Sequence, residues 1–239
     1  MHRSAPQFLT VLILLLLVLP ALRGPAPQAQ ALRVDPPRHE MDTAAGSDDL
    51  FLVYSINNVG YVDVCGCKRK KVRQGSLTRR AAYIHQARYH HENLVLLDGG
   101  NTLFGTDDGK KKDFEKQQLI DKAKVIIESY NRMGYQAMVV GHHDITLGLD
   151  QLREFEQLAT FPLLSANLVY ADDRSPVFGA STIIEAGKLK IGVLAITIDP
   201  IPTYSLERAN PERPLALENA LETARKWGPQ LREQCDIVV

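Results

Sequence analysis

Three short apolar runs constrain the fold most strongly, because each is followed by a polar turn and then by a segment of helical periodicity. The runs are residues 50–56, 94–97 and 136–140, and the helices are expected at 76–89, 114–133 and 149–158. Strands that alternate with helices form a largely parallel sheet with helices on its faces. The sequence therefore predicts an α/β fold.

The turns that end these runs are expected to lie side by side, since the carboxyl ends of parallel strands share one edge of the sheet. They are residues 55–58, 98–101 and 141–144. Ligands bind at this edge in open α/β sheets. The sequence therefore predicts a functional site where the three turns meet.

The remaining segments carry weaker patterns. A short strand is expected from 163 to 167, and residues 182–185 and 190–197 are expected to form a hairpin. Residues 214–231 are expected to be partly helical, with Gly228-Pro229 breaking the helix, and a further strand is expected to begin at Cys235.

The N-terminal residues have the pattern of a secretory signal. Residues 9–22 are almost wholly apolar, and Ala29-Gln30-Ala31 offers small residues at the spacing of a cleavage site. This predicts a signal peptide over 1–31 cleaved near Ala31, a flexible leader over 32–48 and a folded domain over 49–239. The protein is then secreted or periplasmic, where disulfides persist. An uncleaved anchor is the alternative, and no other membrane segment is expected.

The overall charge argues against a nucleic-acid-binding protein. Lys plus Arg and Asp plus Glu both number 28, so the formal net charge is zero, whereas nucleic-acid binding usually requires a basic excess. The run Lys68-Arg69-Lys70-Lys71 is a local exception. It is either a solvated loop or a cationic rim that attracts an anionic substrate.

The side chains in and near the three turns are of metal-ligating types. Carboxylate, amide oxygen, imidazole and thiolate all occur there, and the residues are Asn57, Cys65, Cys67, Asp98, Asn101, His142, His143 and Asp144. Asp98 has the alternative of orienting amides in its own turn, and Asp144 is expected to be structural. Three interpretations of Cys65 and Cys67 stay open: metal ligands, a strained redox disulfide, or a structural pair.

Three motifs in order resemble the metallophosphoesterase domain of the periplasmic 5′-nucleotidase family. They are LLDGGNTLFG (96–105), GYQAMVVGHHDITLG (134–148) and FPLLSANL (161–168). The resemblance covers about residues 49–239. It implies a calcineurin-like four-layer sandwich, in which two β-sheets face each other between outer helices. The domain is expected to be truncated on its C-terminal side.

The resemblance also implies roles for individual residues. The family binds a divalent metal such as Zn²⁺ or Mn²⁺, and the metal ligands fall on Asn57, Val59, Asn101 and His142, with Cys65 and Cys67 as further candidates. Valine cannot bind a metal, and an amide bridges two cations poorly, so the metal site is depleted. The catalytic histidine falls on His143. Arg79 and Asn167 are candidates for binding substrate: one of the adjacent Arg79 and Arg80 is expected to reach substrate phosphate, with surface charge as the alternative. For Asn167 the alternative is a turn-forming residue that tightens the wall of the site.

The segment VCGCKRKKVRQGSLTRRAAYI (64–84) resembles a branch of that family, the UshA-like (seleno)proteins with a Cys-Gly-Cys motif. This branch places a thiol pair where the family has two metal ligands. The chain ends in an apolar run that leaves a sheet edge unpaired, and the resulting hypothesis is an incomplete gene product, ended by a UGA codon read as stop. Sequencing beyond the codon after Val239 tests it.

The resemblance therefore predicts a secreted, metal-dependent phosphoesterase that hydrolyses nucleotides or other small phosphate esters. The alternative is a non-hydrolytic thiol-redox or metal-binding protein on the same fold, which uses Cys65, Cys67 and His142.

Overall fold

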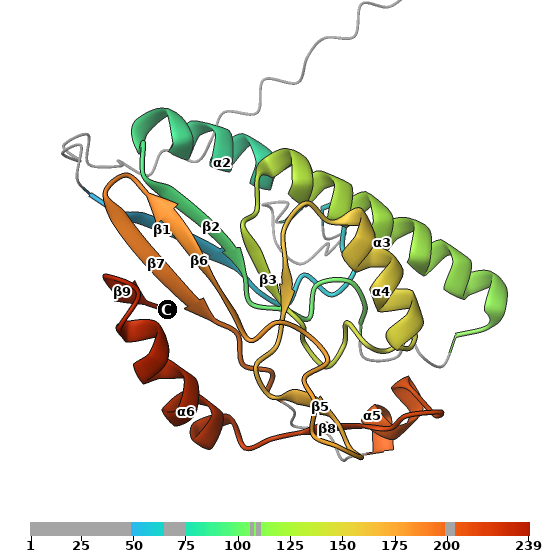
Figure 1. Ribbon diagram of the computed structural model, residues 1–239. Coiled ribbons are helices and arrows are strands. Elements are labelled where there is room, and N and C mark those ends of the chain that lie inside the picture. Colours follow the sequence, from blue (N-terminus) through green and yellow to red (C-terminus); the bar gives the residue numbers. More distant parts are fainter. Residues whose placement is uncertain (1–48, 65–74, 106–107, 109–110, 199–203) are drawn as a thin grey trace, which may run out of the picture. The chain divides into compact units, whose positions relative to one another are not determined.

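A computed structural model of the chain describes residues 49–64, 75–105, 108, 111–198 and 204–239, and all of them belong to one compact unit (Figure 1). The expected signal peptide and leader, residues 1–48, lie outside the described residues. The same holds for Cys65, Cys67 and the basic run that follows them.

A four-stranded parallel sheet forms the centre of the described unit, as the sequence predicts. Its order is β1 (Phe51–Ser55), β2 (Leu94–Asp98), β3 (Ala137–Val139) and β4 (Leu163–Leu164). In the register of the sheet Ser55 pairs with Asp98, and Asp98 pairs with Met138. The turns after β1, β2 and β3 therefore leave the sheet at the same edge.

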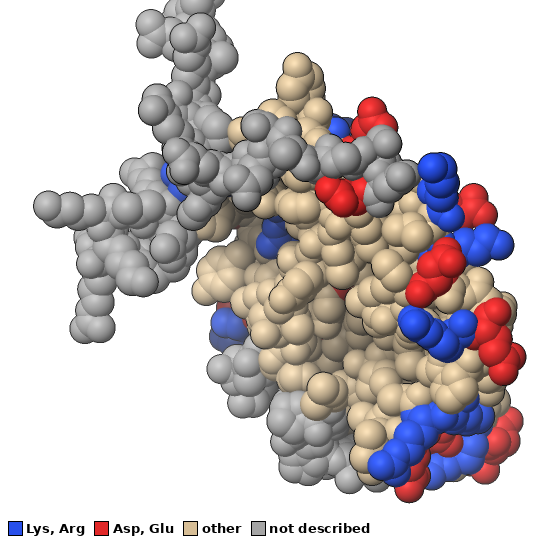
Figure 2. All heavy atoms as spheres, turned by 90° about the vertical axis from the view of Figure 1, so that its left-hand side faces the viewer, with Lys and Arg blue, Asp and Glu red and all other residues tan. Residues whose placement is uncertain are grey.

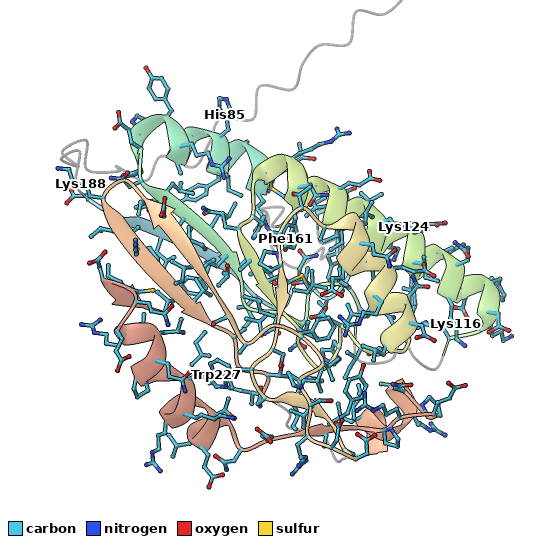
Figure 3. All side chains as sticks on the ribbon, in the orientation of Figure 1. His85, Lys116, Lys124, Phe161, Lys188 and Trp227 are labelled. Carbon is cyan, nitrogen blue, oxygen red and sulfur yellow. The ribbon has the colours of Figure 1, made fainter. Side chains whose placement is uncertain are left out.

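Three helices cover one face of this sheet (Figure 1). They are α2 (Leu77–His90), α3 (Asp113–Met133) and α4 (Leu149–Leu158). Ser76 caps α2, because its Oγ accepts a hydrogen bond from the Arg79 amide at 3.2 Å. The core beneath the helices includes Phe161, whereas Lys124 on α3 points away from it (Figure 3).

A second sheet covers the other face. The strands β6 (Ser181–Ala186) and β7 (Leu189–Leu194) form the expected hairpin, and β9 (Ile237–Val238) pairs parallel with β7. Successive side chains of a strand point to opposite faces. Leu96 accordingly packs in the core under the helices, while Val95 and Leu97 pack in the core shared with β6 and β7.

Helix α6 (Ala220–Arg232) forms the fourth layer, on the outer side of β7. A Cβ atom on Gly192 would lie 3.0 Å from Cys235 Sγ, so a side chain there would press against the segment that follows α6. Cys235 is buried and unpaired. The expected four-layer α/β sandwich is confirmed.

The expected break at Gly228-Pro229 is wrong, because α6 continues through both residues to Arg232. Proline disfavours the helical conformation of the residue before it by contact with that residue's Cβ, and Gly228 has no Cβ. Leu231, two residues further on, is buried. Its burial and the adjacent glycine explain why the last turn of the helix persists.

Two small elements were not anticipated by the sequence patterns. Strand β5 (Leu168–Tyr170) pairs antiparallel with β8 (Leu215–Leu217), which occupies the start of the segment expected to be partly helical. Helix α5 (Tyr204–Ala209) precedes β8. Strands of three residues are too short to show a clear period of two.

Charged side chains are mixed on the surface rather than segregated. Figure 2 shows basic and acidic residues side by side along one part of the visible face, in agreement with the zero formal net charge. Within the described part of the chain, no helix is both long and apolar enough to cross a membrane.

Candidate functional site

The turns after β1, β2 and β3 are joined by hydrogen bonds into one structure. The Asn57 amide donates to the Gly100 carbonyl at 3.0 Å. The Asn101 side chain lies between the other two turns: its Nδ2 donates to Asn57 Oδ1 at 3.0 Å, and its Oδ1 accepts from the His143 amide at 3.1 Å. The structure therefore brings Asn57, Asn101 and His143 together at the carboxyl edge of the sheet.

Asp144 holds two of these turns in place. Its Oδ2 accepts hydrogen bonds from the amides of Asn101 and Gly141, and its Oδ1 accepts from those of Thr102 and Leu103, all between 2.7 and 2.9 Å. Burial raises the pKa of Asp144 to about 7, against the lowering effect of the amide hydrogen bonds. The carboxylate is 1% exposed and is used entirely within the turns.

Asp98 is a second buried carboxylate with its hydrogen bonds inside the protein. It accepts from the Gly100 amide at 2.9 Å and from the hydroxyls of Ser55, Thr102 and Tyr130 at 2.5 to 2.9 Å. Burial raises the pKa of Asp98, although these hydrogen bonds oppose the rise. Asp98 therefore orients its own turn and does not face a ligand.

Arg80 connects this buried network to the site. Its Nη2 donates to Asn58 Oδ1 at 2.9 Å, and its Nη1 donates to the hydroxyl of Tyr130, which in turn donates to Asp98. Tyr130 stacks on Tyr135 with ring centroids 3.8 Å apart. Burial lowers the pKa of Arg80, but the two tyrosines and Asp98 raise it, and the net shift is upward. The guanidinium is charged and held in one position.

A cavity of about 540 Å³ opens beside Asn57. Arg79 and Arg80 from the first turn of α2 line it, together with Ile56, Asn58, Tyr61, Asp63, Gly75 and Ser76. Its volume is within the range of small-molecule sites. The sequence singles out Arg79, and Asn58 lies in the turn expected at 55–58, but no sequence pattern marks Tyr61.

His142 and His143 lie together, with ring centroids 4.0 Å apart. Burial lowers the pKa of His143 below its usual value, the neighbouring His142 lowers it further, and Asp108 opposes the shift. His142 Nδ1 is buried and has no hydrogen-bond partner among the described residues. Depending on the tautomer, that nitrogen could accept a hydrogen bond from a water molecule or a ligand, or donate one to it.

The His143 imidazole is expected to titrate below pH 6.5 in NMR spectra of the protein recorded in EDTA. Its folded pKa is lowered, so its contribution to stability is present above the unfolded pKa and is lost as the pH falls toward the folded value. Replacement His142→Gln should move the pKa of His143 upward only in part, because burial is the larger cause. A wild-type value at or above 6.5 would contradict this assignment.

The described residues do not fit a dinuclear metal centre. No group of three or more His, Cys, Asp or Glu side chains within them is placed to hold a metal ion. The amide oxygens of Asn57 and Asn101 already accept hydrogen bonds. Val59 stands where the resemblance implies a histidine ligand, and its φ is 44°. His142 Nδ1 is a buried side-chain nitrogen without a hydrogen-bond partner among the described residues, and Cys65 and Cys67 lie outside that part of the chain.

Asn167 is not among the residues that line the cavity at Asn57. It is 1% exposed, its Nδ2 donates to the carbonyls of Thr197 and Glu218, and its Oδ1 accepts from the Thr197 amide. In this arrangement the side chain fixes the wall of the domain, and its amide hydrogens are not directed at a ligand.

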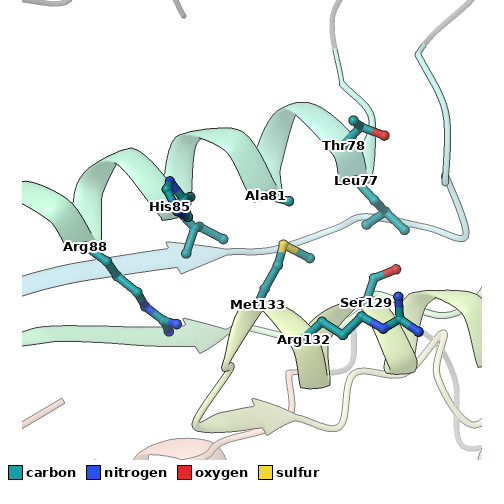
Figure 4. Close-up of a pocket in the computed structure, with 9 residues that line it drawn as sticks. Leu77, Thr78, Ala81, His85, Arg88, Ser129, Arg132 and Met133 are labelled. Carbon is teal, nitrogen blue, oxygen red and sulfur yellow. The ribbon is translucent and has the colours of Figure 1, made fainter. Parts of the chain in front are cut away.

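A different cavity of about 380 Å³ lies between α2 and α3 (Figure 4). Leu77, Ala81, Ile84 and Met133 supply apolar lining, with His85, Arg88 and Arg132 also bordering it. It shares no lining residue with the cavity at Asn57, so it is not part of the strand-end site.

Solved structures with the same fold are calcineurin-like phosphoesterases and nucleotidases. The chain matches the calcineurin-like phosphoesterase YfkN of Bacillus subtilis with a TM-score of 0.62 and 21% identity, over 79% of this chain and 60% of that one. It matches a putative 5′-nucleotidase of Staphylococcus aureus with a TM-score of 0.61 and 21% identity, over 79% and 36%. The fold is that of the calcineurin-like phosphoesterases.

Sequence relatives carry the comparison further, although no family model matches the chain. The chain is 30% identical over 175 residues to the 2′,3′-cyclic-nucleotide 2′-phosphodiesterase/3′-nucleotidase of Salmonella typhimurium, covering 68% of this chain and 26% of that protein. It is 31% identical over 107 residues to the protein UshA of Escherichia coli, covering 45% and 18%. The resemblance to the 5′-nucleotidase and calcineurin-like phosphoesterase family is confirmed. The chain spans about a quarter of the length of the first of these relatives.

Proposed function

We propose that the protein is a secreted phosphoesterase-like member of the 5′-nucleotidase family, which receives a nucleotide or another small phosphate ester at the carboxyl edge of its parallel sheet. The observation that supports this most is the position of His143, which follows β3 and whose backbone amide donates to Asn101 Oδ1, while Asn101 Nδ2 donates to Asn57 in the lining of the cavity. Relatives named for nucleotide phosphoesterase and nucleotidase activity support the substrate class.

His143 is the residue proposed to move a proton during hydrolysis. Its lowered pKa leaves the imidazole mostly neutral near pH 7, so it accepts a proton from water and, once protonated, donates to the leaving oxygen. Arg79 and Arg80 line the cavity, and their guanidinium groups would balance the charge of the phosphate. A divalent metal agrees with the class of protein. Because the described residues do not fit a dinuclear centre, we assign no step to a metal.

The proposal extends to location and domain organisation. The signal pattern over 1–31 supports secretion, and a leader over 32–48 would join it to the domain that begins at residue 49. The alternative thiol-redox or metal-binding function depends on Cys65 and Cys67, which lie outside the described residues. The named relatives favour the phosphoesterase over it.

Replacement His143→Ala is expected to lower hydrolysis of a phosphodiester by about 100-fold or more, because proton transfer by a positioned side chain contributes rate factors of that order. The assay compares bis-p-nitrophenyl phosphate, a 2′,3′-cyclic nucleotide and AMP, each with EDTA, Mn²⁺ or Zn²⁺.

The matched control is His85→Ala, which removes an exposed imidazole from α2 and should leave the rate unchanged. Equal rates for His143→Ala and the wild type would contradict the role of His143. A wild-type protein that neither hydrolyses nor binds these compounds would contradict the proposed function as a whole.

A further inference from the structure

Two amides stand where the resemblance implies two metal-binding carboxylates. Asn101 Nδ2 donates to Asn57 Oδ1 at 3.0 Å. Two carboxylates at this separation would repel each other unless a cation or a shared proton lay between them. A pair of amides is neutral and complementary, because one offers an N–H and the other a carbonyl oxygen. The contact between the two amides therefore needs no metal ion.

The charged groups around the amide pair also do not form the negative environment that a cation site needs. Asp98 and Asp144 are each 1% exposed and accept hydrogen bonds within the turns. The cavity that Asn57 lines carries two arginines, Arg79 and Arg80, and one aspartate, Asp63. Its described lining is thus positive on balance, which favours an anion over a cation.

The polar groups of the cavity are also partly fixed in advance. Arg80 is held by Asn58 and Tyr130, and Asn57 is held by Asn101. The guanidinium presents planar donors suited to phosphate oxygens. Tyr61 is 60% exposed at the same cavity and offers a ring face. The arginines can therefore bind a phosphate, and the Tyr61 ring can stack against a planar group attached to it.

We propose that phosphate monoester anions bind this cavity directly, between Asn57, which Asn101 holds in place, and the Arg79–Arg80 pair, without a bridging metal ion. The inference rests on the proposed function and specifies how that site receives its substrate.

The test is calorimetric titration of the purified protein with AMP and with inorganic phosphate, in EDTA and in Mn²⁺. Metal removal is checked by elemental analysis. We expect saturable binding of AMP in EDTA, with an affinity that Mn²⁺ changes less than twofold. Arg79→Gln should weaken binding in EDTA by about tenfold, the effect of losing one charge-assisted hydrogen bond.

Asn57→Asp gives the sharper result, because it places a negative charge beside the anion. We expect it to weaken AMP binding in EDTA by at least about tenfold. The double variant Asn57→Asp/Asn101→Asp should gain a Mn²⁺-dependent rise in melting temperature that the wild type lacks. Asn219→Asp is the matched control, since it adds the same charge at the exposed cap of α6, where Asp caps as well as Asn; its AMP affinity should stay within twofold.

The outcomes separate the two proposals. Binding of AMP by the wild type only in Mn²⁺ overturns the metal-free site and leaves the phosphoesterase function standing. Undiminished binding by Asn57→Asp overturns the position of the site. Absence of AMP binding and of hydrolysis in both conditions overturns the inference and the proposed function together.

Discussion

Replacement Asp144→Asn is expected to lower the free energy of unfolding by about 3–5 kcal/mol, although it keeps the size of the side chain. Each carboxylate oxygen accepts two backbone amides. In asparagine one oxygen becomes an NH₂ group, which then faces two N–H donors whichever way the amide is turned. A buried donor left without an acceptor costs roughly 1–3 kcal/mol, and backbone amides cannot reverse their role.

Asp98→Asn is the matched comparison and is expected to cost less, about 1–2 kcal/mol. Asp98 is equally buried, but three of its partners are the hydroxyls of Ser55, Thr102 and Tyr130. A hydroxyl rotates to accept a hydrogen bond from the new NH₂ group. Urea unfolding followed by circular dichroism measures both variants. Equal losses, or a larger loss for Asp98→Asn, would show that the number of fixed donors does not control the cost.

The elements that the sequence predicted well are those with long or uninterrupted patterns. Helix α4 spans the expected residues 149–158, because Leu149, Leu152 and Phe155 repeat at helical spacing and are all buried. The meeting of the three turns also follows from the sequence, since parallel strands that alternate with helices end at one edge. The predicted topology alone was therefore enough to predict that Asn57, Asn101 and His143 lie close together.

The parts that the sequence could not predict depend on contacts between residues far apart in the chain. Arg80 and Tyr130 are 50 positions apart, and nothing in either local pattern indicates that they pair. The hydrogen bond between Asn57 and Asn101 is equally long-range. Strands β5 and β8 are three residues each and form by pairing with each other. The roles of Cys65 and Cys67 stay predictions, because those residues lie outside the described part of the chain.

The position of the Asn57–Asn101 pair depends on how closely two turns approach each other. Gly100 has a φ of 89°, and a Cβ atom there would lie 2.7 Å from the Val139 carbonyl oxygen and 2.9 Å from the Gly141 amide nitrogen. Both neighbours are backbone atoms, which cannot rotate out of the way as a side chain does. Any residue with a Cβ would separate the turn after β2 from the turn after β3.

Gly100→Ala is therefore expected to destabilise the protein by about 2–5 kcal/mol, the sum of an unfavourable φ and the displacement of packed backbone. Gly105→Ala is the matched control from the same loop. Its φ is not positive, and the Cβ would meet its nearest neighbour, Asp108 Oδ2, at an ordinary 3.6 Å. The control should be neutral or gain up to about 1 kcal/mol in stability, because alanine restricts the unfolded chain.

Chemical denaturation of both variants measures the difference in the free energy of unfolding. Titration of Gly100→Ala with AMP measures whether the site still binds its ligand. If Gly100→Ala were as stable as Gly105→Ala, the two turns would not approach as closely as the hydrogen bonds of Asn101 require, and the amide pair would lose its structural basis.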